Sequence, residues 1–77
     1  MLKLIVAIPC PYCSLVVDFI KQNKITSVEI HDTEWNSTEH QKLKETYGKS
    51  QVPLLLINGS PLYESLDIIN YLRNNEL

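Results

Sequence analysis

The sequence has no long hydrophobic run and no marked excess of charge. The longest uninterrupted apolar stretch, Leu4–Ile8, has five residues, whereas a membrane-spanning helix needs about twenty. The net charge of −2 at pH 7 argues against a nucleic-acid-binding surface and against binding to an anionic membrane. The N-terminus also lacks the apolar segment and the small-residue cleavage site of a signal peptide, so a cytoplasmic location is expected.

Internal repeats, low-complexity stretches and linkers are absent as well. The 77 residues predict a single domain, 1–77, with a small core. Because 44% of the residues are hydrophobic, the chain has too much apolar material for a disordered segment.

Cysteine is scarce, and the two that occur lie close together at Cys10 and Cys13. A structural disulfide across so short a loop would remove little unfolded-chain entropy. Zinc would need two further ligands, and only His31 and His40 remain, neither in a spacing typical of zinc sites, so no metal is predicted. Two inert core cysteines are also disfavoured, because a proline-initiated helix that begins on a cysteine is an unusual place for inert packing. This spacing favours redox chemistry.

Hydrophobic periodicity and turn residues predict seven elements. The predicted strands are Lys3–Ile8, Thr26–His31, Val52–Ile57 and Pro61–Tyr63, the last two joined by a hairpin at Asn58-Gly59. The predicted helices run from Pro11 to about Asn23, from an Asn36 N-cap with Glu39 as capping-box partner to Tyr47 before Gly48, and over Ser65–Arg73. The apolar faces are expected to be Leu15, Val16, Phe19 and Ile20 in the first helix and Leu66, Ile69 and Leu72 in the last.

The resulting order is β-α-β-α-β-β-α, which belongs to the α/β class. The first βαβ unit implies parallel strands with a right-handed crossover, and the late hairpin adds an antiparallel pair. We therefore expect a mixed four-stranded sheet flanked by three helices on its two faces, in a thioredoxin-like arrangement.

Cys10 lies where a strand is predicted to end and a helix to begin. Pro11 suits the first helical position because it has no N–H to lose there, which puts Cys10 at the N-cap. Its sulfur can then accept hydrogen bonds from the N–H groups of Tyr12 and Cys13, and the positive end of the helix dipole favours the nucleophilic thiolate. Cys13, one turn into the helix, is expected to be more buried and to act as the resolving thiol.

Three sequence elements resemble those of known glutathione-binding proteins. Cys10-Pro11-Tyr12-Cys13 after an N-terminal strand resembles the active site of dithiol glutaredoxins. Gln51-Val52-Pro53 resembles their Thr-Val-Pro element, in which the proline is cis and the valine backbone pairs with glutathione. The segment Pro61–Ile69 resembles the Glu-Ser element of glutathione transferases and of transferase-like glutaredoxins, which implies that Glu64 and Ser65 bind the γ-glutamyl end of glutathione.

The resemblance also assigns roles at the edges of this site and shows two departures. It implies that Tyr12 lines the glutathione groove. Glutaredoxins often carry Lys or Arg where Ala7 stands, and Pro9 before the nucleophile is unusual. Lys49 is a candidate for the glycine carboxylate, with plain surface exposure as the alternative. A simple N-cap is the alternative for Ser65.

The remaining aromatic and histidine residues receive no functional role at this point. Trp35 is interpreted as loop packing. His31 and His40 are expected at the surface or the rim, and neither is an obvious base.

The sequence therefore predicts a glutathione-dependent thiol–disulfide oxidoreductase of the glutaredoxin type, similar to the N-terminal domain of transferase-like glutaredoxins. Glutathione would be the co-substrate, and no other cofactor is implied. The partners would be disulfide-containing or glutathionylated proteins, and the protein itself is expected to be a monomer. The alternatives are a glutathione-transferase-like domain, disfavoured by the missing second domain, a glutathione-ligated iron–sulfur carrier, and an inactive interaction domain.

Overall fold

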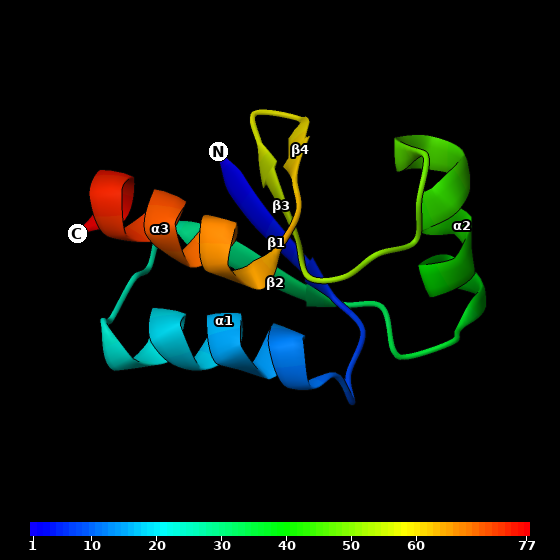
Figure 1. Cartoon of the computed structure of the whole chain (residues 1–77), viewed down its shortest axis with the longest axis horizontal. Coiled ribbons are helices and arrows are strands. Elements are labelled where there is room, and N and C mark those ends of the chain that lie inside the picture. Colours follow the sequence, from blue (N-terminus) through cyan, green and yellow to red (C-terminus); the bar gives the residue numbers. More distant parts are fainter.

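The structure, a computed structural model, describes residues 1–77 and has the expected order of elements (Figure 1). The four strands are β1 (Leu2–Val6), β2 (Val28–Asp32), β3 (Leu54–Ile57) and β4 (Ser60–Leu62), and the three helices are α1 (Pro11–Gln22), α2 (Thr38–Tyr47) and α3 (Ser65–Glu76).

The sheet has the strand order β2-β1-β3-β4. β1 runs parallel to β2 and antiparallel to β3, and β3 pairs antiparallel with β4, so the sheet is mixed. Asn58 and Gly59 have φ values of 51° and 90° in the turn between β3 and β4, which is the conformation that a two-residue hairpin requires. The predicted fold class is confirmed.

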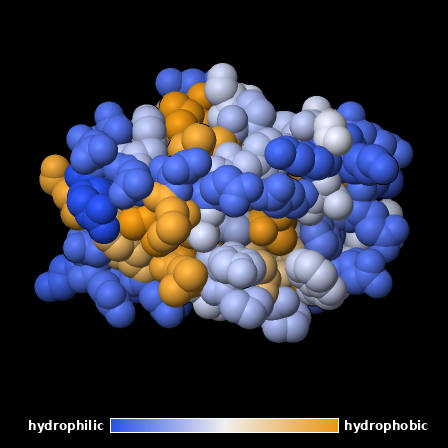
Figure 2. All heavy atoms as spheres, viewed as in Figure 1, coloured by the Kyte–Doolittle hydropathy of each residue, from blue (hydrophilic) through white to orange (hydrophobic).

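The alternation of side chains along β1 divides the core between the two faces of the sheet. Leu4 and Val6 belong to the larger cluster, packed against α1 and α3, whereas Ile5 belongs to a smaller cluster with Leu43 of α2. Figure 1 shows α1 and α3 side by side, with α2 set apart. Figure 2 shows hydrophobic atoms gathered where α1 and α3 face each other and hydrophilic atoms over α2. The helices therefore lie on both faces, and α2 covers its face with few apolar side chains.

The apolar faces of α1 and α3 differ from the prediction. The buried residues are Cys13, Val16 and Ile20 in α1 and Ile68 and Leu72 in α3. The predicted core residues Leu15 and Leu66 are 51% and 69% exposed. The prediction was wrong at these two positions because α1 and α3 face each other and the sheet with the rows of side chains that begin at Cys13 and Ile68. Leu15 and Leu66 are thereby left at the mouth of the groove described below.

The start of α2 also corrects the prediction. Asn36 has a φ of 64°, which is incompatible with the extended backbone of an N-cap. Ser37 is the N-cap instead, and its hydroxyl accepts the N–H of His40 at 3.0 Å. Glu39 therefore does not close a capping box and pairs with His31 at 2.8 Å. Gly48 ends the helix as predicted, with a φ of 88° and its N–H bonded to Lys44.

The strands are displaced by one or two residues from their predicted bounds. β1 ends at Val6 because the Ile8 N–H bonds to the Asp32 carboxylate and Pro9 has no N–H to give to a ladder. Pro53 likewise delays β3 to Leu54. None of the helices is both long and apolar enough to cross a membrane.

Candidate active site

Cys10 occupies the N-cap of α1, as the sequence predicts. Its backbone is extended, with φ −155° and ψ 114°, and Pro11 follows at the first helical position. From the sequence, the N–H groups of Tyr12 and Cys13 are expected at the Cys10 sulfur. The Cys13 N–H makes this hydrogen bond, at 3.3 Å. An N–H donor and the positive end of α1 together favour negative charge on the Cys10 sulfur.

Cys13 lies behind Cys10 and has no solvent-exposed surface. Burial raises the pKa of the Cys13 thiol from 9.0 to about 12, and the hydrogen bond and charge of Cys10 act in the same direction. Both cysteines are free thiols. The two sulfurs therefore differ as expected: the Cys10 sulfur borders a groove and is held at a helix terminus, whereas the Cys13 thiol stays protonated.

The loop that precedes Cys10 is held by the last residue of β2 and by the segment that follows this strand. The Ile8–Pro9 peptide is cis. The Ile8 N–H donates to Asp32 Oδ1 at 3.0 Å, and the Ile8 carbonyl accepts the N–H of Trp35 at 3.1 Å. The Glu34 N–H also donates to Asp32 Oδ1, at 2.8 Å. The two N–H donors, of Ile8 and Glu34, lower the pKa of the Asp32 carboxyl below its usual value. The main chain at Ile8, two residues before Cys10, is thus held by hydrogen bonds through both its N–H and its carbonyl.

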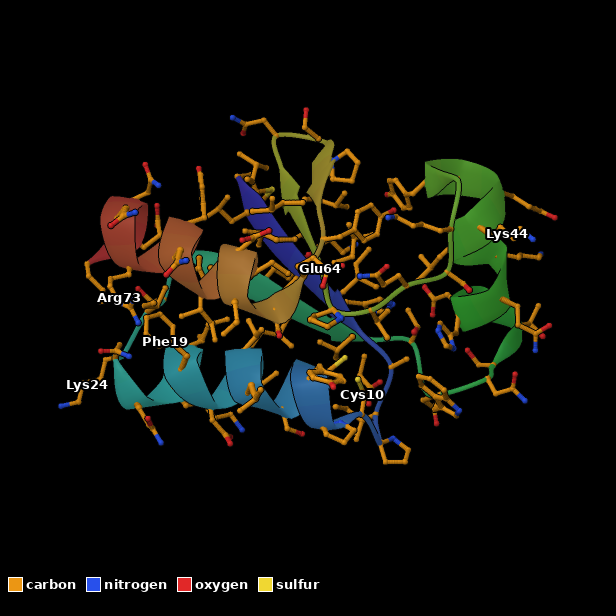
Figure 3. The ribbon with its side chains drawn as sticks, viewed as in Figure 1. Cys10, Phe19, Lys24, Lys44, Glu64 and Arg73 are labelled. Carbon is orange, nitrogen blue, oxygen red and sulfur yellow. The ribbon has the colours of Figure 1, made fainter.

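The Val52–Pro53 peptide is also cis. Just before it, the Gln51 side-chain amide donates to Glu64 Oε1 at 2.9 Å. This bond joins the loop between α2 and β3 to the start of α3. Figure 3 shows Cys10 at the first turn of α1 and Glu64 at the first turn of α3, at the same end of the two neighbouring helices.

Glu64, rather than Ser65, is the N-cap of α3. Its φ is 72°, its carbonyl accepts the N–H of Ile68 at 3.0 Å, and its side chain makes no capping bond. Ser65 therefore stands at the first helical position, and its interpretation as a plain N-cap is wrong. Because the first-turn N–H groups of a helix have no acceptor within the helix, the Ser65–Asp67 segment offers donors next to the two carboxylates of Glu64 and Asp67.

Two adjoining hollows connect these elements into one groove. The first, of about 770 Å³, lies between α1, the cis-proline loop and α3 and is lined by Tyr12, Leu15, Gln51, Val52, Pro53, Glu64, Ser65, Leu66 and Asp67. The second, of about 780 Å³, continues past Cys10 and shares Tyr12, Gln51 and Val52 with the first. The structure therefore brings every predicted site residue to this groove, except Cys13, which is buried behind it.

Two residues on the Cys10 side of the groove, Trp35 and His40, were not assigned a site role from the sequence. Trp35, interpreted as loop packing, is 55% exposed at the rim. His40, expected at the surface or the rim, lines the groove but is only 7% exposed, and its burial comes from contacts that hydrophobic periodicity does not predict. Lys49 is the one cation lining the groove, and its Nζ lies 4.2 Å from the centre of the Tyr63 ring.

Solved structures with the same fold include glutathione transferases and a glutaredoxin. Human glutathione-S-transferase T1-1 in its apo form matches with a TM-score of 0.84 at 23% identity, over 99% of this chain and 32% of that one. An epsilon-class glutathione S-transferase from the housefly, Musca domestica, matches with a TM-score of 0.81 at 20% identity, over 99% and 35% of the two chains. Oxidized glutaredoxin 2 from Chlamydomonas reinhardtii matches with a TM-score of 0.69 at 22% identity, over 99% and 74%.

These comparisons show a transferase-like thioredoxin fold and do not single out the dithiol glutaredoxin type. The chain spans about a third of the length of the transferases it matches. No curated protein matches the sequence. Residues 4–76 match the family model described as glutathione S-transferase, N-terminal domain. Members of this family use glutathione as a substrate and need no prosthetic cofactor. The chain belongs to the family of glutathione S-transferase N-terminal domains.

Proposed function

We propose that the protein is a glutathione-dependent thiol–disulfide oxidoreductase with Cys10 as its nucleophile and Cys13 as its resolving thiol. The observation that carries this proposal is the pair of sulfurs at the start of α1. One sulfur accepts an N–H bond at the edge of a groove, and the other is a buried thiol whose pKa is about 12. Such an asymmetric pair suits two successive exchange steps.

The groove has the chemistry to bind glutathione next to Cys10. The first-turn N–H groups and hydroxyl at Ser65 suit the γ-glutamyl carboxylate, and the carboxylate of Glu64 suits its ammonium. The main chain of Val52, before the cis peptide to Pro53, suits the peptide part of the cysteinyl residue. Tyr12 and Gln51 line the groove on either side.

At the other end, Lys49 is the cation available for the glycine carboxylate. Many glutaredoxins carry a basic residue at the position of Ala7, which is fully buried here. Lys49 would supply the positive charge that this position lacks. Proteins that carry a glutathionyl group or a disulfide are the proposed substrates, in the reducing conditions of the cytoplasm.

In the monothiol reaction, the Cys10 thiolate attacks the glutathione sulfur of a glutathionylated protein. A Cys10–glutathione disulfide forms, and the protein thiolate leaves and takes up a proton. The thiolate of a second glutathione then attacks this disulfide, which releases oxidised glutathione and restores the Cys10 thiolate. In the dithiol reaction, Cys10 attacks a protein disulfide, and Cys13 displaces the protein thiol and closes a Cys10–Cys13 bond that two glutathione molecules reduce.

The family match favours conjugation of glutathione to electrophiles as a second candidate. The two candidates need different groups at the start of α1. A transferase stabilises the thiolate of glutathione itself and does not become oxidised, whereas the proposed oxidoreductase needs the Cys10 sulfur as a reactant.

The deciding experiment measures turnover of a small glutathione mixed disulfide by the purified protein, with glutathione, glutathione reductase and NADPH. We expect turnover by the unaltered protein, none by Cys10→Ser, and none with 1-chloro-2,4-dinitrobenzene as the electrophile. The Tyr71→Phe variant, altered away from the groove, serves as the control and should match the unaltered protein. Conjugation without disulfide turnover would support the transferase, and disulfide turnover by Cys10→Ser would refute the assigned nucleophile.

A further inference from the structure

His40 has a buried polar side chain that takes part in no step of the proposed reaction. It is the third residue of α2, is 7% exposed and lines the Cys10 side of the groove. A buried imidazole is costly unless both of its nitrogens have partners, so its two hydrogen bonds indicate what it does.

Both ring nitrogens are used, and together they fix the tautomer. The Asn36 N–H donates to His40 Nδ1 at 2.9 Å, so Nδ1 carries no proton. Nε2 therefore carries the proton and donates to the Ser50 carbonyl at 3.0 Å. The Trp35 ring packs against the imidazole, with 5.0 Å between the ring centres. The ring is therefore held in one position between two loops.

The loop that His40 reaches makes few hydrogen bonds, and its other contacts are the packing of Val52 against the core and of Lys49 over the Tyr63 ring. Residues 49–53 take part in none of the backbone–backbone hydrogen bonds outside the helices and strands. Two side-chain bonds tie this loop to the rest of the molecule, one from His40 to Ser50 and one from Gln51 to Glu64. The first of them lies two residues before Val52.

The segment that holds His40 also holds the nucleophile loop. The Trp35 N–H donates to the Ile8 carbonyl, two residues before Cys10, and the next residue, Asn36, donates to His40. A continuous set of contacts therefore runs from the Cys10 loop through the residues before α2 to the cis-proline loop.

We propose that His40 is a positioning residue that sets the place of the Val52 main chain relative to the Cys10 sulfur, and so the alignment of a bound glutathionyl group. The inference rests on the proposed function for its effect on catalysis. The restraint on the loop itself stands on the two hydrogen bonds of the imidazole.

Two substitutions separate these bonds. In His40→Gln the side-chain amide nitrogen reaches the place of Nε2 and can still donate to the Ser50 carbonyl, while the Asn36 bond is lost. In His40→Asn the amide oxygen lies near the place of Nδ1 and can still accept from Asn36, but the side chain is too short for Ser50. His31→Asn is the matched control, because His31 pairs with Glu39 outside the groove.

The experiment measures ¹⁵N order parameters of the Gln51 and Val52 amides, together with KM and kcat for the glutathione mixed disulfide. For His40→Asn we expect the order parameters to fall from about 0.85 toward 0.6 and KM to rise about fivefold, with kcat within about twofold. His40→Gln should restore both readouts, and His31→Asn should change neither. Equal behaviour of His40→Asn and His40→Gln, or unchanged loop order in His40→Asn, would overturn the inference.

Two measurements keep this test independent of folding and of the proposed function. In the unaltered protein, the ¹⁵N shifts of the His40 ring should show a neutral imidazole protonated on Nε2, and a ring protonated on Nδ1 would refute the inference without any variant. If the unaltered protein turns over no mixed disulfide, the proposed function fails, while the order parameters still decide whether His40 restrains the loop.

Discussion

The two thiols should react with an alkylating reagent at very different rates. Alkylation requires the thiolate, and the pKa of the Cys13 thiol is about 12 where an ordinary thiol has 9.0. Three pH units correspond to a thousandfold smaller thiolate fraction near neutral pH, which is about 3 × 10⁻⁵ at pH 7.5. Complete burial of Cys13 slows the reaction further. In the folded reduced protein, iodoacetamide should therefore modify Cys13 at least about a thousandfold more slowly than an ordinary exposed thiol.

The assay is a time course at pH 7.5 followed by peptide mass spectrometry, which assigns the label to a cysteine. One label per folded chain is expected, at Cys10, and two after denaturation in guanidinium. In Cys10→Ser the contributions of the Cys10 sulfur are gone, but desolvation, the largest cause of the raised pKa, remains, so Cys13 should still react slowly. Labelling of Cys13 in the folded protein at a rate near that of a free thiol would refute the assigned asymmetry.

Three further predictions follow from the site. Cys13→Ser should keep turnover of glutathione mixed disulfides and lose reduction of protein disulfides, measured with a glutathionylated peptide and with insulin. Ser65→Ala should raise KM for the mixed disulfide about three- to tenfold at unchanged kcat in steady-state kinetics, because the hydrogen bond proposed between the Ser65 hydroxyl and glutathione would be lost. The pKa of Asp32 is lowered by the N–H donors of Ile8 and Glu34, so its stabilisation is complete above the ordinary carboxyl pKa of about 3.9 and is lost as pH falls through the lower folded value. The Tm of Asp32→Asn should therefore fall less steeply than that of the unaltered protein between pH 4 and 2.

Structural features that depend only on residues close together in the chain were predicted well from the sequence. The start of α1 follows from a cysteine before Pro11, and the hairpin follows from Asn58-Gly59, because both rest on backbone geometry within two or three residues. The order of elements then restricts the topology, since a βαβ unit has one handedness. These local rules also placed Cys10 and Cys13 correctly relative to α1.

Features set by contacts between distant segments were predicted less well. Asn36 and Ser37 are equally good N-cap residues by type, and only the φ of 64° at Asn36 excludes the first. Leu15 and Leu66 fit a helical stripe by spacing but face the groove. His40 is buried, packs against Trp35 and bonds to Ser50, ten residues away, and hydrophobic periodicity predicts none of these contacts.

The raised pKa of Cys13 also bears on the order of events in the proposed dithiol reaction. Two of its causes, the hydrogen bond that the Cys13 thiol donates to the Cys10 sulfur and the charge of that sulfur, belong to the reduced state. When Cys10 enters a mixed disulfide, its sulfur loses the charge that opposes a second thiolate. The pKa of Cys13 should then fall, so its thiolate becomes more available once there is a disulfide to resolve. Desolvation remains and keeps Cys13 less acidic than an exposed thiol. The mixed disulfide should therefore persist long enough for a second glutathione to compete with Cys13. Under the proposed function, the buried Cys13 thiol would then influence whether the monothiol or the dithiol reaction follows.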